Sequence, residues 1–260
     1  MRRLIVRPGA LGDFIVSLPA MECLRADYIE VWTARPHVPL ARFAHRARAI
    51  ASTGLDWIGV REPPACLVED LRGFDSIVSW YGANRPEFRD AVRELGLNFT
   101  FFTALPPEGL LHAVDFYLQQ VRALAACESD GIPRISCPGR ESAARENLAV
   151  IHPFSGSARK NWPLEKFRAL AARLERAMPV RWCAGPEDPP CPEGAHGAVR
   201  IDDLYELACW LARARLYIGN DSGVTHLAAA VGTPVLALFG PTDPAVWAPR
   251  GPNVRIARWR

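Results

Sequence analysis

The chain has 260 residues, of which 49% are hydrophobic and 23% charged, and its formal net charge is +3 at pH 7. This composition is typical of a globular protein with one large domain or two modest ones. The basic residues are dispersed along the chain, which argues against nucleic-acid binding. No apolar run approaches the roughly 20 residues of a membrane span. The apolar stretch near the N-terminus is broken at once by Arg7 and Pro8, so no signal peptide is expected.

The cysteines bear on the cellular compartment. Their odd number and the lack of any Cys-x-x-Cys spacing argue against a disulfide framework and against a zinc site. There are seven: Cys23, Cys66, Cys127, Cys137, Cys183, Cys191 and Cys209. We therefore expect a reducing, cytoplasmic environment.

The first half alternates between strand-like and helix-like segments. The expected strands are 4–7, 28–33, 76–81 and 98–103, and the expected helices are 13–25, 39–48, 85–95 and 112–127. Such alternation predicts a parallel sheet wrapped by helices.

The second half repeats this pattern after a break. Segment 128–140 loses periodicity and gains Gly and Pro, as a linker does. Beyond it, strands are expected at 149–153 and 180–184 and helices at 164–177 and 204–214, followed by two more strands with a helix between them within 217–240. The sequence therefore predicts two α/β units, residues 1–135 and 136–260, with a ligand crevice between them.

Segment 217–240, YIGNDSGVTHLAAAVGTPVLALFG, combines a strand, a polar turn, a small-residue helix and a second buried strand. The turn places Asp221, Ser222 and Gly223 where the free N–H groups and the positive end of a helix face outward. Such a corner binds anions, phosphates above all. His226 lies one turn further on the same helix face and would add a hydrogen-bond donor. The Gly-x-Ser-x-Gly spacing of a serine hydrolase is absent.

A second candidate phosphate-binding loop is HPFSGSARKNWP, residues 152–163, between a strand and a helix. Ser155 and Ser157 offer hydroxyl groups, and Lys160, one of the chain's two lysines, can reach a phosphate. The spacing is not that of a Walker loop, which argues against an ATPase.

Two further loops carry carboxylates. RPGALGD lacks the Gly-x-Gly-x-x-Gly dinucleotide fingerprint, and its Asp13 is either an ordinary helix N-cap or a base facing the crevice. Glu187, in CAGPEDP, follows a strand and is either part of a surface turn or a ligand of the two hydroxyls of a ribose. Since no cluster with metal-ligand spacing is present, we expect a diphosphate to be neutralised by Lys160, His226 and helix N-termini without a metal or other cofactor.

Four ordered motifs together resemble glycosyltransferase family 9, the bacterial ADP-heptose:lipopolysaccharide heptosyltransferases. They are GALGDFIVSLPA (9–20), SGSARKNWP (155–163), GPE (185–187) and GNDSGVTHLAAAVGTPVLALFGPTDP (219–244). The resemblance covers both halves and is strongest over residues 149–244. It implies a GT-B fold, in which an N-terminal Rossmann-like unit takes the acceptor and a C-terminal one takes an ADP-sugar. It also implies inverting transfer without a metal.

The resemblance further implies a role for each matching residue. Asp13 would be the general base. Lys160 and the backbone of Ser222 and Gly223 would hold the diphosphate, with Ser155 and Ser157 as nearby donors. Glu187 would bind the ribose, Asp221 the sugar hydroxyls and His226 the phosphates. The expected reaction moves heptose from ADP-heptose to a lipopolysaccharide core or another surface glycan. It would take place at the cytoplasmic face of the inner membrane, with peripheral association. Two alternatives stay open: a nucleotide-sugar-binding protein without transfer activity, and a nucleotide-sugar 2-epimerase.

Overall fold

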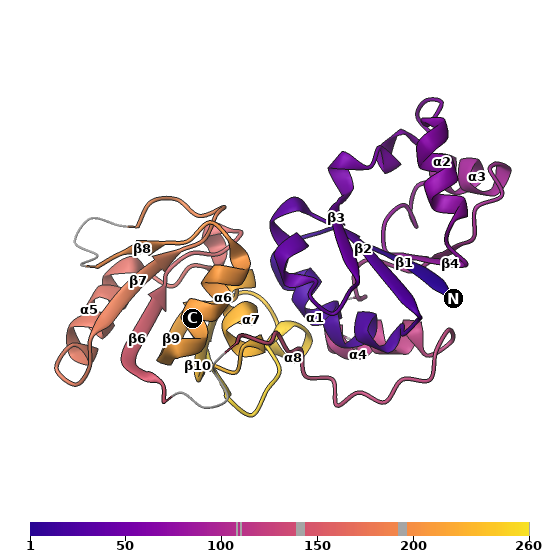
Figure 1. Ribbon diagram of the computed structural model, residues 1–260. Helices are drawn as coiled ribbons and strands as arrows, with labels where there is room; N and C mark the ends of the chain where they lie inside the picture. Colours follow the sequence, from indigo (N-terminus) through magenta and orange to yellow (C-terminus); the bar gives the residue numbers. More distant parts are fainter. Residues whose placement is uncertain (108, 110, 139–143, 192–196, 260) are drawn as a thin grey trace.

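The computed structural model describes residues 1–107, 109, 111–138, 144–191 and 197–259. In this part of the chain all strand pairs are parallel and form two sheets, which belong to two units lying side by side (Figure 1). The first sheet has the order β3 (Arg46–Ala49), β2 (Tyr28–Thr33), β1 (Arg2–Arg7), β4 (Ser76–Ser79), β5 (Phe99–Phe101). The second has the order β11 (Val254–Arg258), β10 (Val235–Phe239), β9 (Ala214–Asn220), β6 (Glu146–His152), β7 (Val180–Ala184), β8 (Val199–Arg200). Both are Rossmann orders, which confirms the predicted α/β class.

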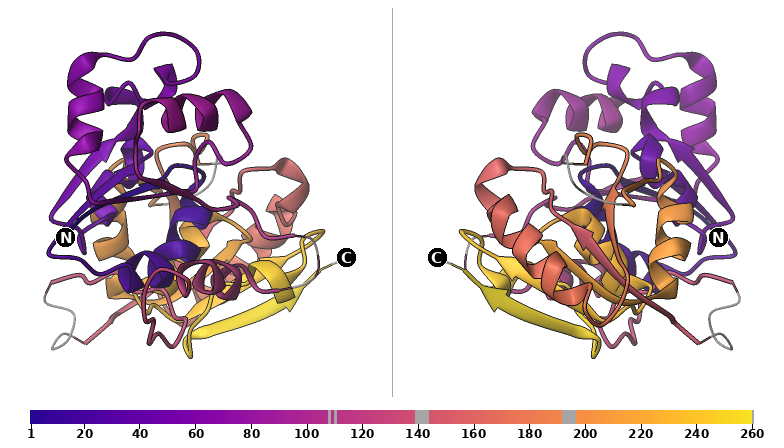
Figure 2. Two further views of the ribbon diagram at one scale, coloured as in Figure 1. Left: turned by 90° about the vertical axis from the view of Figure 1, so that its right-hand side faces the viewer. Right: turned by 90° about the vertical axis from the view of Figure 1, so that its left-hand side faces the viewer.

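Helices cover both faces of each sheet (Figures 1 and 2). The first unit contains α1 (Leu11–Cys23), α2 (Ala65–Arg72), α3 (Pro86–Glu94) and α4 (Ala113–Val121); the second contains α5 (Leu164–Leu174), α6 (Leu204–Arg213), α7 (Gly223–Ala230) and α8 (Pro244–Trp247). Helices α1, α4, α6 and α7 share one hydrophobic cluster that joins the facing sides of the two sheets. The outer faces pack separately, against α2 and α3 in the first unit and against α5 in the second.

Alternation along the central strands produces these separate layers. In β1, Ile5 belongs to the shared inner cluster, whereas Leu4 and Val6 belong to the outer one. The same division occurs in β6, where Val150 faces inward and Ile151 outward. Because neighbouring side chains of a strand point to opposite faces, a continuous apolar strand needs helices on both sides.

A tight contact between the two units joins the N-terminal ends of α1 and α7. A Cβ atom added to Gly223 would lie 2.7 Å from Cβ of Leu11 and 3.0 Å from the backbone nitrogen of Gly12. Carbon atoms do not approach this closely, so glycine is required at position 223 for the two helix ends to meet.

Two polar contacts also cross between the units. The guanidinium of Arg42 lies 4.5 Å from the ring centroid of Tyr205 in α6. Asp115 in α4 forms an ion pair with Arg250, with 2.7 Å between Oδ1 and Nη1. The predicted division between residues 135 and 136 falls after α4 and before β6, and that boundary stays a prediction.

Several helix and strand predictions differ from the structure. Segment 39–48, expected to be helical, contains the end of the 3₁₀ helix η1 (Arg35–Leu40) and the start of β3, which pairs with β2. Pairing of Arg46–Ala49 with Glu30–Thr33 at the edge of the sheet overrides the helical pattern of the sequence. The helix expected at 112–127 ends at Val121. Helix α2 and strand β11 were not predicted at all.

The cysteine pattern argued against a disulfide framework, but the structure contains a disulfide bond. Cys23, the last residue of α1, is bonded to Cys127, which follows α4, across 104 residues of sequence. The packing of α1 on α4 brings the two cysteines together, and spacing rules for cysteines that are close in sequence do not detect such a pair.

We expect Gly223→Ala to lower the free energy of unfolding by about 1–3 kcal/mol, because the added methyl group must displace Leu11 and the backbone of Gly12. Gly12→Ala is the matched control on the opposite helix, since its Cβ would meet its nearest neighbour, in His226, at 3.5 Å. Urea unfolding followed by circular dichroism measures both. Equal stability of the two variants would contradict a helix contact that depends on Gly223.

Candidate functional site

A cavity of about 670 Å³ lies between the two units. Its volume is in the range of small-molecule sites. Loops that follow β1, β6, β7 and β9 line it, so it lies at the carboxyl ends of the central strands of both sheets. Eight of the nine predicted site residues line this cavity: Asp13, Ser155, Lys160, Glu187, Asp221, Ser222, Gly223 and His226. Ser157 does not line it, and its role as a donor stays a prediction.

The N-termini of two helices meet at the cavity wall. In α7, Ser222 is the N-cap, and its Oγ accepts a hydrogen bond from the backbone nitrogen of Thr225 (3.3 Å). In α1 the N-cap position is Ala10, and Asp13 is the third helical residue, so Asp13 is not the N-cap. The first N–H groups of each helix have no acceptor within the helix. Together they give the cavity an electropositive wall suited to an anion.

Lys160 and Asp221 form an ion pair in the second unit. The Nζ atom lies 2.8 Å from Oδ2 of Asp221, and the hydroxyl of Thr242 donates to the same oxygen at 2.8 Å. The side chain of Asp221 is 6% exposed, whereas that of Lys160 is 33% exposed. The ammonium group thus keeps contact with the cavity while the carboxylate holds it in place. One of its three N–H donors is used by Asp221, and two remain for a ligand.

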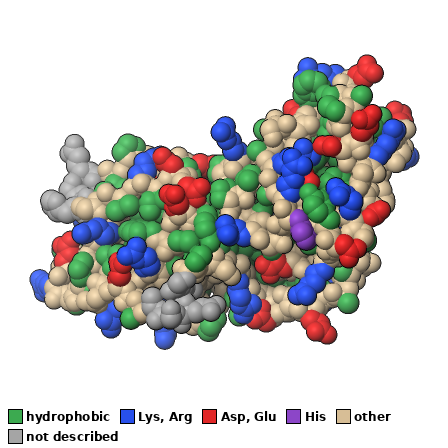
Figure 3. Space-filling model, viewed as in Figure 1, with side chains coloured by type: hydrophobic (Ala, Val, Ile, Leu, Met, Phe, Trp, Pro, Cys, Tyr) green, Lys and Arg blue, Asp and Glu red, His purple; other side chains and the backbone are tan. Residues whose placement is uncertain are grey.

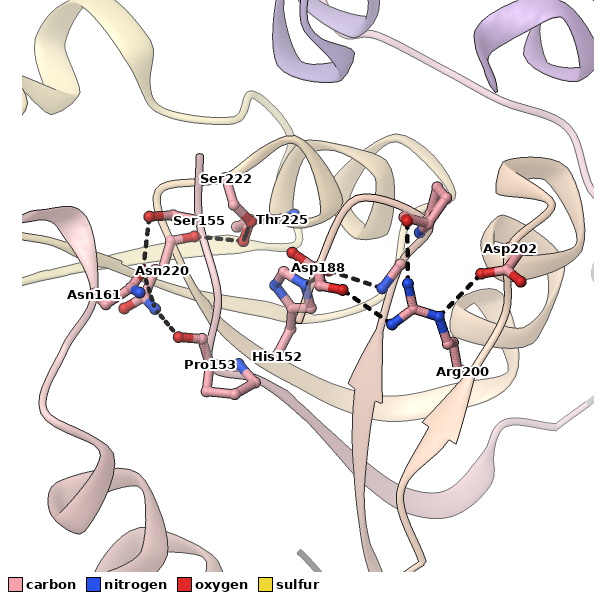
Figure 4. A network of polar contacts seen from close by, with 12 residues as sticks. His152, Pro153, Ser155, Asn161, Asp188, Arg200, Asp202, Asn220, Ser222 and Thr225 are labelled. Carbon is pink, nitrogen blue, oxygen red and sulfur yellow. Dashed lines mark hydrogen bonds and ion pairs between the residues drawn. The ribbon is translucent and has the colours of Figure 1, made fainter. Parts of the chain in front are cut away.

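The loop that carries Lys160 is fixed by the buried Asn220 at the end of β9. Its Oδ1 accepts from the backbone nitrogen of Trp162 (2.8 Å). Its Nδ2 donates to the carbonyl of Pro153 (2.7 Å), as Figure 4 shows. The hydroxyl of Ser155 lies 2.7 Å from Oδ1 of Asn161 within the same loop. A single amide therefore connects both ends of the loop to the neighbouring strand.

The turn that carries Glu187 is held by its neighbour Asp188, which the sequence did not single out. Oδ2 of Asp188 lies 2.7 Å from Nε2 of His152 and accepts from the backbone nitrogen of Gly185 (2.7 Å) (Figure 4). Nη1 of Arg200 donates to the backbone carbonyl of Asp188 (2.9 Å). Burial pushes the pKa of Asp188 up, but its contacts with His152 and Gly185 and the charge of Arg200 outweigh burial, so the pKa is lower than usual. Asp188 is thus a firm anchor for the turn.

His226 is buried in the first turns of α7 and faces α1. Burial lowers its pKa to about 4, and the charges of His112 and Lys160 act in the same direction. The carboxylate of Asp221 and a hydrogen bond to the backbone of Trp247 act in the opposite direction but do not outweigh burial, so the imidazole is neutral at pH 7. Its single N–H is used by the Trp247 carbonyl, and the other ring nitrogen can only accept a hydrogen bond.

A buried guanidinium lies behind Asp13. Arg7, at the end of β1, is 2% exposed and donates to the backbone carbonyl of Asp13 (3.1 Å), the hydroxyl of Tyr117 (2.8 Å) and Oγ of Ser17 (3.1 Å). Within the described residues it forms no ion pair. Burying a cation without a counterion is costly, and the hydrogen bonds of Arg7 offset part of that cost. They also fix the backbone of the Asp13 turn and place a positive charge behind it. Sequence reasoning missed it, because Arg7 resembles any other strand-terminal arginine.

Two Rossmann-like units whose parallel sheets face a shared cavity define a GT-B fold. The solved structure of Escherichia coli ADP-heptose lipopolysaccharide heptosyltransferase II has this fold, with a TM-score of 0.74 and 19% sequence identity over 100% of this chain and 91% of that one. The family model for glycosyltransferase family 9 (heptosyltransferase) matches residues 112–259. The chain belongs to this family.

Curated relatives agree with this assignment. Lipopolysaccharide heptosyltransferase 1 of Pseudomonas aeruginosa is 34% identical over 94% of this chain and 80% of its own length. Lipopolysaccharide heptosyltransferase 3 of E. coli strain K12 is 33% identical over 42% of this chain, and the match spans only 36% of that relative.

We expect Asp188→Ala to weaken ADP binding about 10-fold, because the Glu187 turn loses its anchor and the buried His152 loses its partner. Asp202→Ala is the matched control: Asp202 also contacts Arg200 (3.2 Å) but is exposed and does not line the cavity. Titration calorimetry with ADP measures both. If Asp188→Ala and wild type bind ADP with the same dissociation constant, the anchoring of the Glu187 turn by Asp188 does not contribute to ADP binding.

Proposed function

We propose that this protein is an inverting, metal-independent glycosyltransferase that moves heptose from ADP-heptose to a lipopolysaccharide core or another surface glycan. The observation that carries the proposal is the division of the cavity: Asp13 faces it from the first unit, and Lys160, Glu187 and Asp221 face it from the second. Family membership supports the same assignment. The names of the relatives, which mention ADP-heptose and lipopolysaccharide, support the choice of donor and acceptor.

The second unit would bind the donor. Glu187 would accept hydrogen bonds from the two hydroxyls of the ribose, and Asp221 would accept from hydroxyls of the heptose. The diphosphate would lie between Lys160 and the N-terminus of α7, next to His226. This arrangement neutralises the diphosphate through fixed protein groups, because a helix N-terminus and an ammonium group together stabilise phosphate charge.

The transfer step would be a single displacement at the anomeric carbon. The acceptor hydroxyl oxygen forms a bond to that carbon, its proton moves to the carboxylate of Asp13, and the bond from the carbon to the phosphate oxygen breaks, releasing ADP. Positive charge develops on the sugar ring and negative charge on the leaving diphosphate. Lys160 and the N–H groups of α7 would stabilise the latter, and donors fixed before the reaction cost no reorganisation.

The acceptor determines where the protein would work. Within the described chain, no helix is both long and apolar enough to cross a bilayer. We place the reaction at the cytoplasmic face of the inner membrane with peripheral association, since a lipopolysaccharide acceptor is lipid-linked. The first unit, which contributes Asp13, would receive the acceptor.

Asp13→Asn is expected to lower kcat for transfer about 10²–10⁴-fold, because the amide cannot take the proton of the acceptor hydroxyl. The dissociation constant for ADP should stay within about twofold of wild type, since Asp13 is not assigned to the donor. Product analysis with ADP-heptose alone separates the alternatives. An epimerised nucleotide sugar, or tight ADP binding by wild type without any product from acceptors, would overturn the proposal.

Lys160→Met is expected to raise the dissociation constant for ADP-heptose about 10- to 100-fold, because a charge-assisted hydrogen bond to phosphate is lost. Lys166→Met is the control. Lys166 is the chain's other lysine, exposed in the first turn of α5 and outside the cavity. If both variants bind the donor equally well, Lys160 does not hold the diphosphate.

A further inference from the structure

His37 lines the cavity from the first unit and has no part in the functions assigned so far. It lies in η1, which follows β2 at the carboxyl edge of the first sheet, so it reaches the cavity from the same unit as Asp13. Its imidazole packs against the ring of Phe14, the residue after Asp13, with 5.3 Å between centroids. Helix η1 also packs against α6 of the second unit. His37 is therefore fixed close to the place where acceptor and donor would meet.

The polar groups of His37 are incompletely used. The residue is 3% exposed, and its Nδ1 is buried without a hydrogen-bond partner among the described residues. Buried polar atoms normally have partners, and leaving one unpaired costs about 1–3 kcal/mol. An incompletely paired imidazole in a cavity wall points to a side chain placed for a ligand rather than for packing, because a phenyl ring would pack against Phe14 without leaving a nitrogen unpaired.

Burial and the nearby charge of Arg7 determine the protonation state of His37, and with it the hydrogen bond that the imidazole can offer. Burial and then the charge of Arg7 lower its pKa to about 4, so the ring is neutral at pH 7. A neutral imidazole has one N–H and one bare nitrogen. Since an unpaired N–H is the more costly group to bury, the proton belongs on Nε2 and the bare nitrogen is the shielded Nδ1. Nε2, unlike Nδ1, is not fully shielded, and within the described residues it has no hydrogen-bond partner, so Nε2–H is the group left for the cavity that His37 lines.

A neutral N–H donor selects a particular kind of ligand atom. It does not attract a carboxylate or a phosphate as strongly as the cationic wall formed by Lys160 and α7 does. It suits the uncharged oxygen of a sugar hydroxyl. Asp13 lies on the same side of the cavity, so the oxygen in question belongs to the sugar that presents its nucleophilic hydroxyl to Asp13.

We propose that His37 is an acceptor-binding residue, which donates a hydrogen bond from Nε2 to a hydroxyl oxygen of the acceptor sugar next to the attacking hydroxyl. This inference rests on the proposed transferase function. The hydrogen bond orients the acceptor toward Asp13 and the anomeric carbon, and a neutral donor leaves the negative charge of Asp13 available for the proton.

The test compares His37→Phe and His37→Asn with wild type in the transfer reaction. The acceptor is core-truncated lipopolysaccharide and the donor is ADP-heptose. We expect His37→Phe to raise the KM for the acceptor at least 10-fold, while the KM for ADP-heptose and the slow hydrolysis of ADP-heptose by water alone stay within about twofold. His37→Asn, which keeps an N–H donor, should recover part of the loss. Failure of both substitutions to change the acceptor KM would overturn the inference.

His45→Phe is the matched control. His45 belongs to the same unit and accepts a hydrogen bond from the backbone nitrogen of Ile29 (3.0 Å), but it does not line the cavity. Its acceptor KM should match that of wild type, and an increase equal to that of His37→Phe would identify a general effect on folding and overturn the inference.

An NMR measurement separates failure of the inference about His37 from failure of the proposed function. In wild-type protein labelled with ¹⁵N-histidine and saturated with ADP, adding the truncated lipopolysaccharide should shift a ring-nitrogen resonance that is missing from the His37→Asn spectrum. If wild type forms product but this resonance does not move, the inference about His37 fails and the transferase function stands. If wild type forms no product and the acceptor shifts no resonance, the proposed function fails and the inference fails with it.

Discussion

The contact between the N-terminal ends of α1 and α7 is the constraint on which the site depends. Gly223 allows the backbone of one helix to approach Leu11 of the other, and a single hydrophobic cluster continues from this contact into both sheets. Consequently, the loops after the central strands of the two units open into one cavity. The site is therefore a property of the interface between the units, and neither sheet alone contains it.

The second unit shows how a Rossmann topology becomes a polar site. Strands β6 and β9 are neighbours in the sheet, yet the chain leaves them in opposite directions, so the loops after them diverge and leave room for a ligand. Asn220 links these two loops, and Lys160 pairs with Asp221 across them. The polar side chains thus hold the groups that we propose to bind phosphate in position before any ligand arrives, which is what electrostatic catalysis requires.

The sequence predicted the two sheets, the cavity and most of the polar side chains that line it, because motifs at the ends of parallel strands must lie at one edge of a sheet. It did not predict the residues that support those motifs. Asp188 and His152 are distant in sequence, and their contact depends on the pairing of β6 with β7. The bond between Cys23 and Cys127 depends in the same way on tertiary packing. Local sequence patterns identify the groups that face a ligand. The contacts that support these groups join residues distant in sequence, and only the folded structure reveals them.

The two sides of the cavity differ in how they treat charge, and this difference fits the proposed transfer. On the donor side, Lys160 and the end of α7 present positive charge directly to the cavity. On the acceptor side the positive charge of Arg7 is buried behind the Asp13 turn, and the neighbouring imidazole of His37 is neutral. In the proposed reaction a diphosphate would be attracted most strongly to the side that carries the ammonium group of Lys160, while Asp13 would meet the acceptor from the opposite unit. This separation would keep the proposed base from pairing with the cation that stabilises the leaving group.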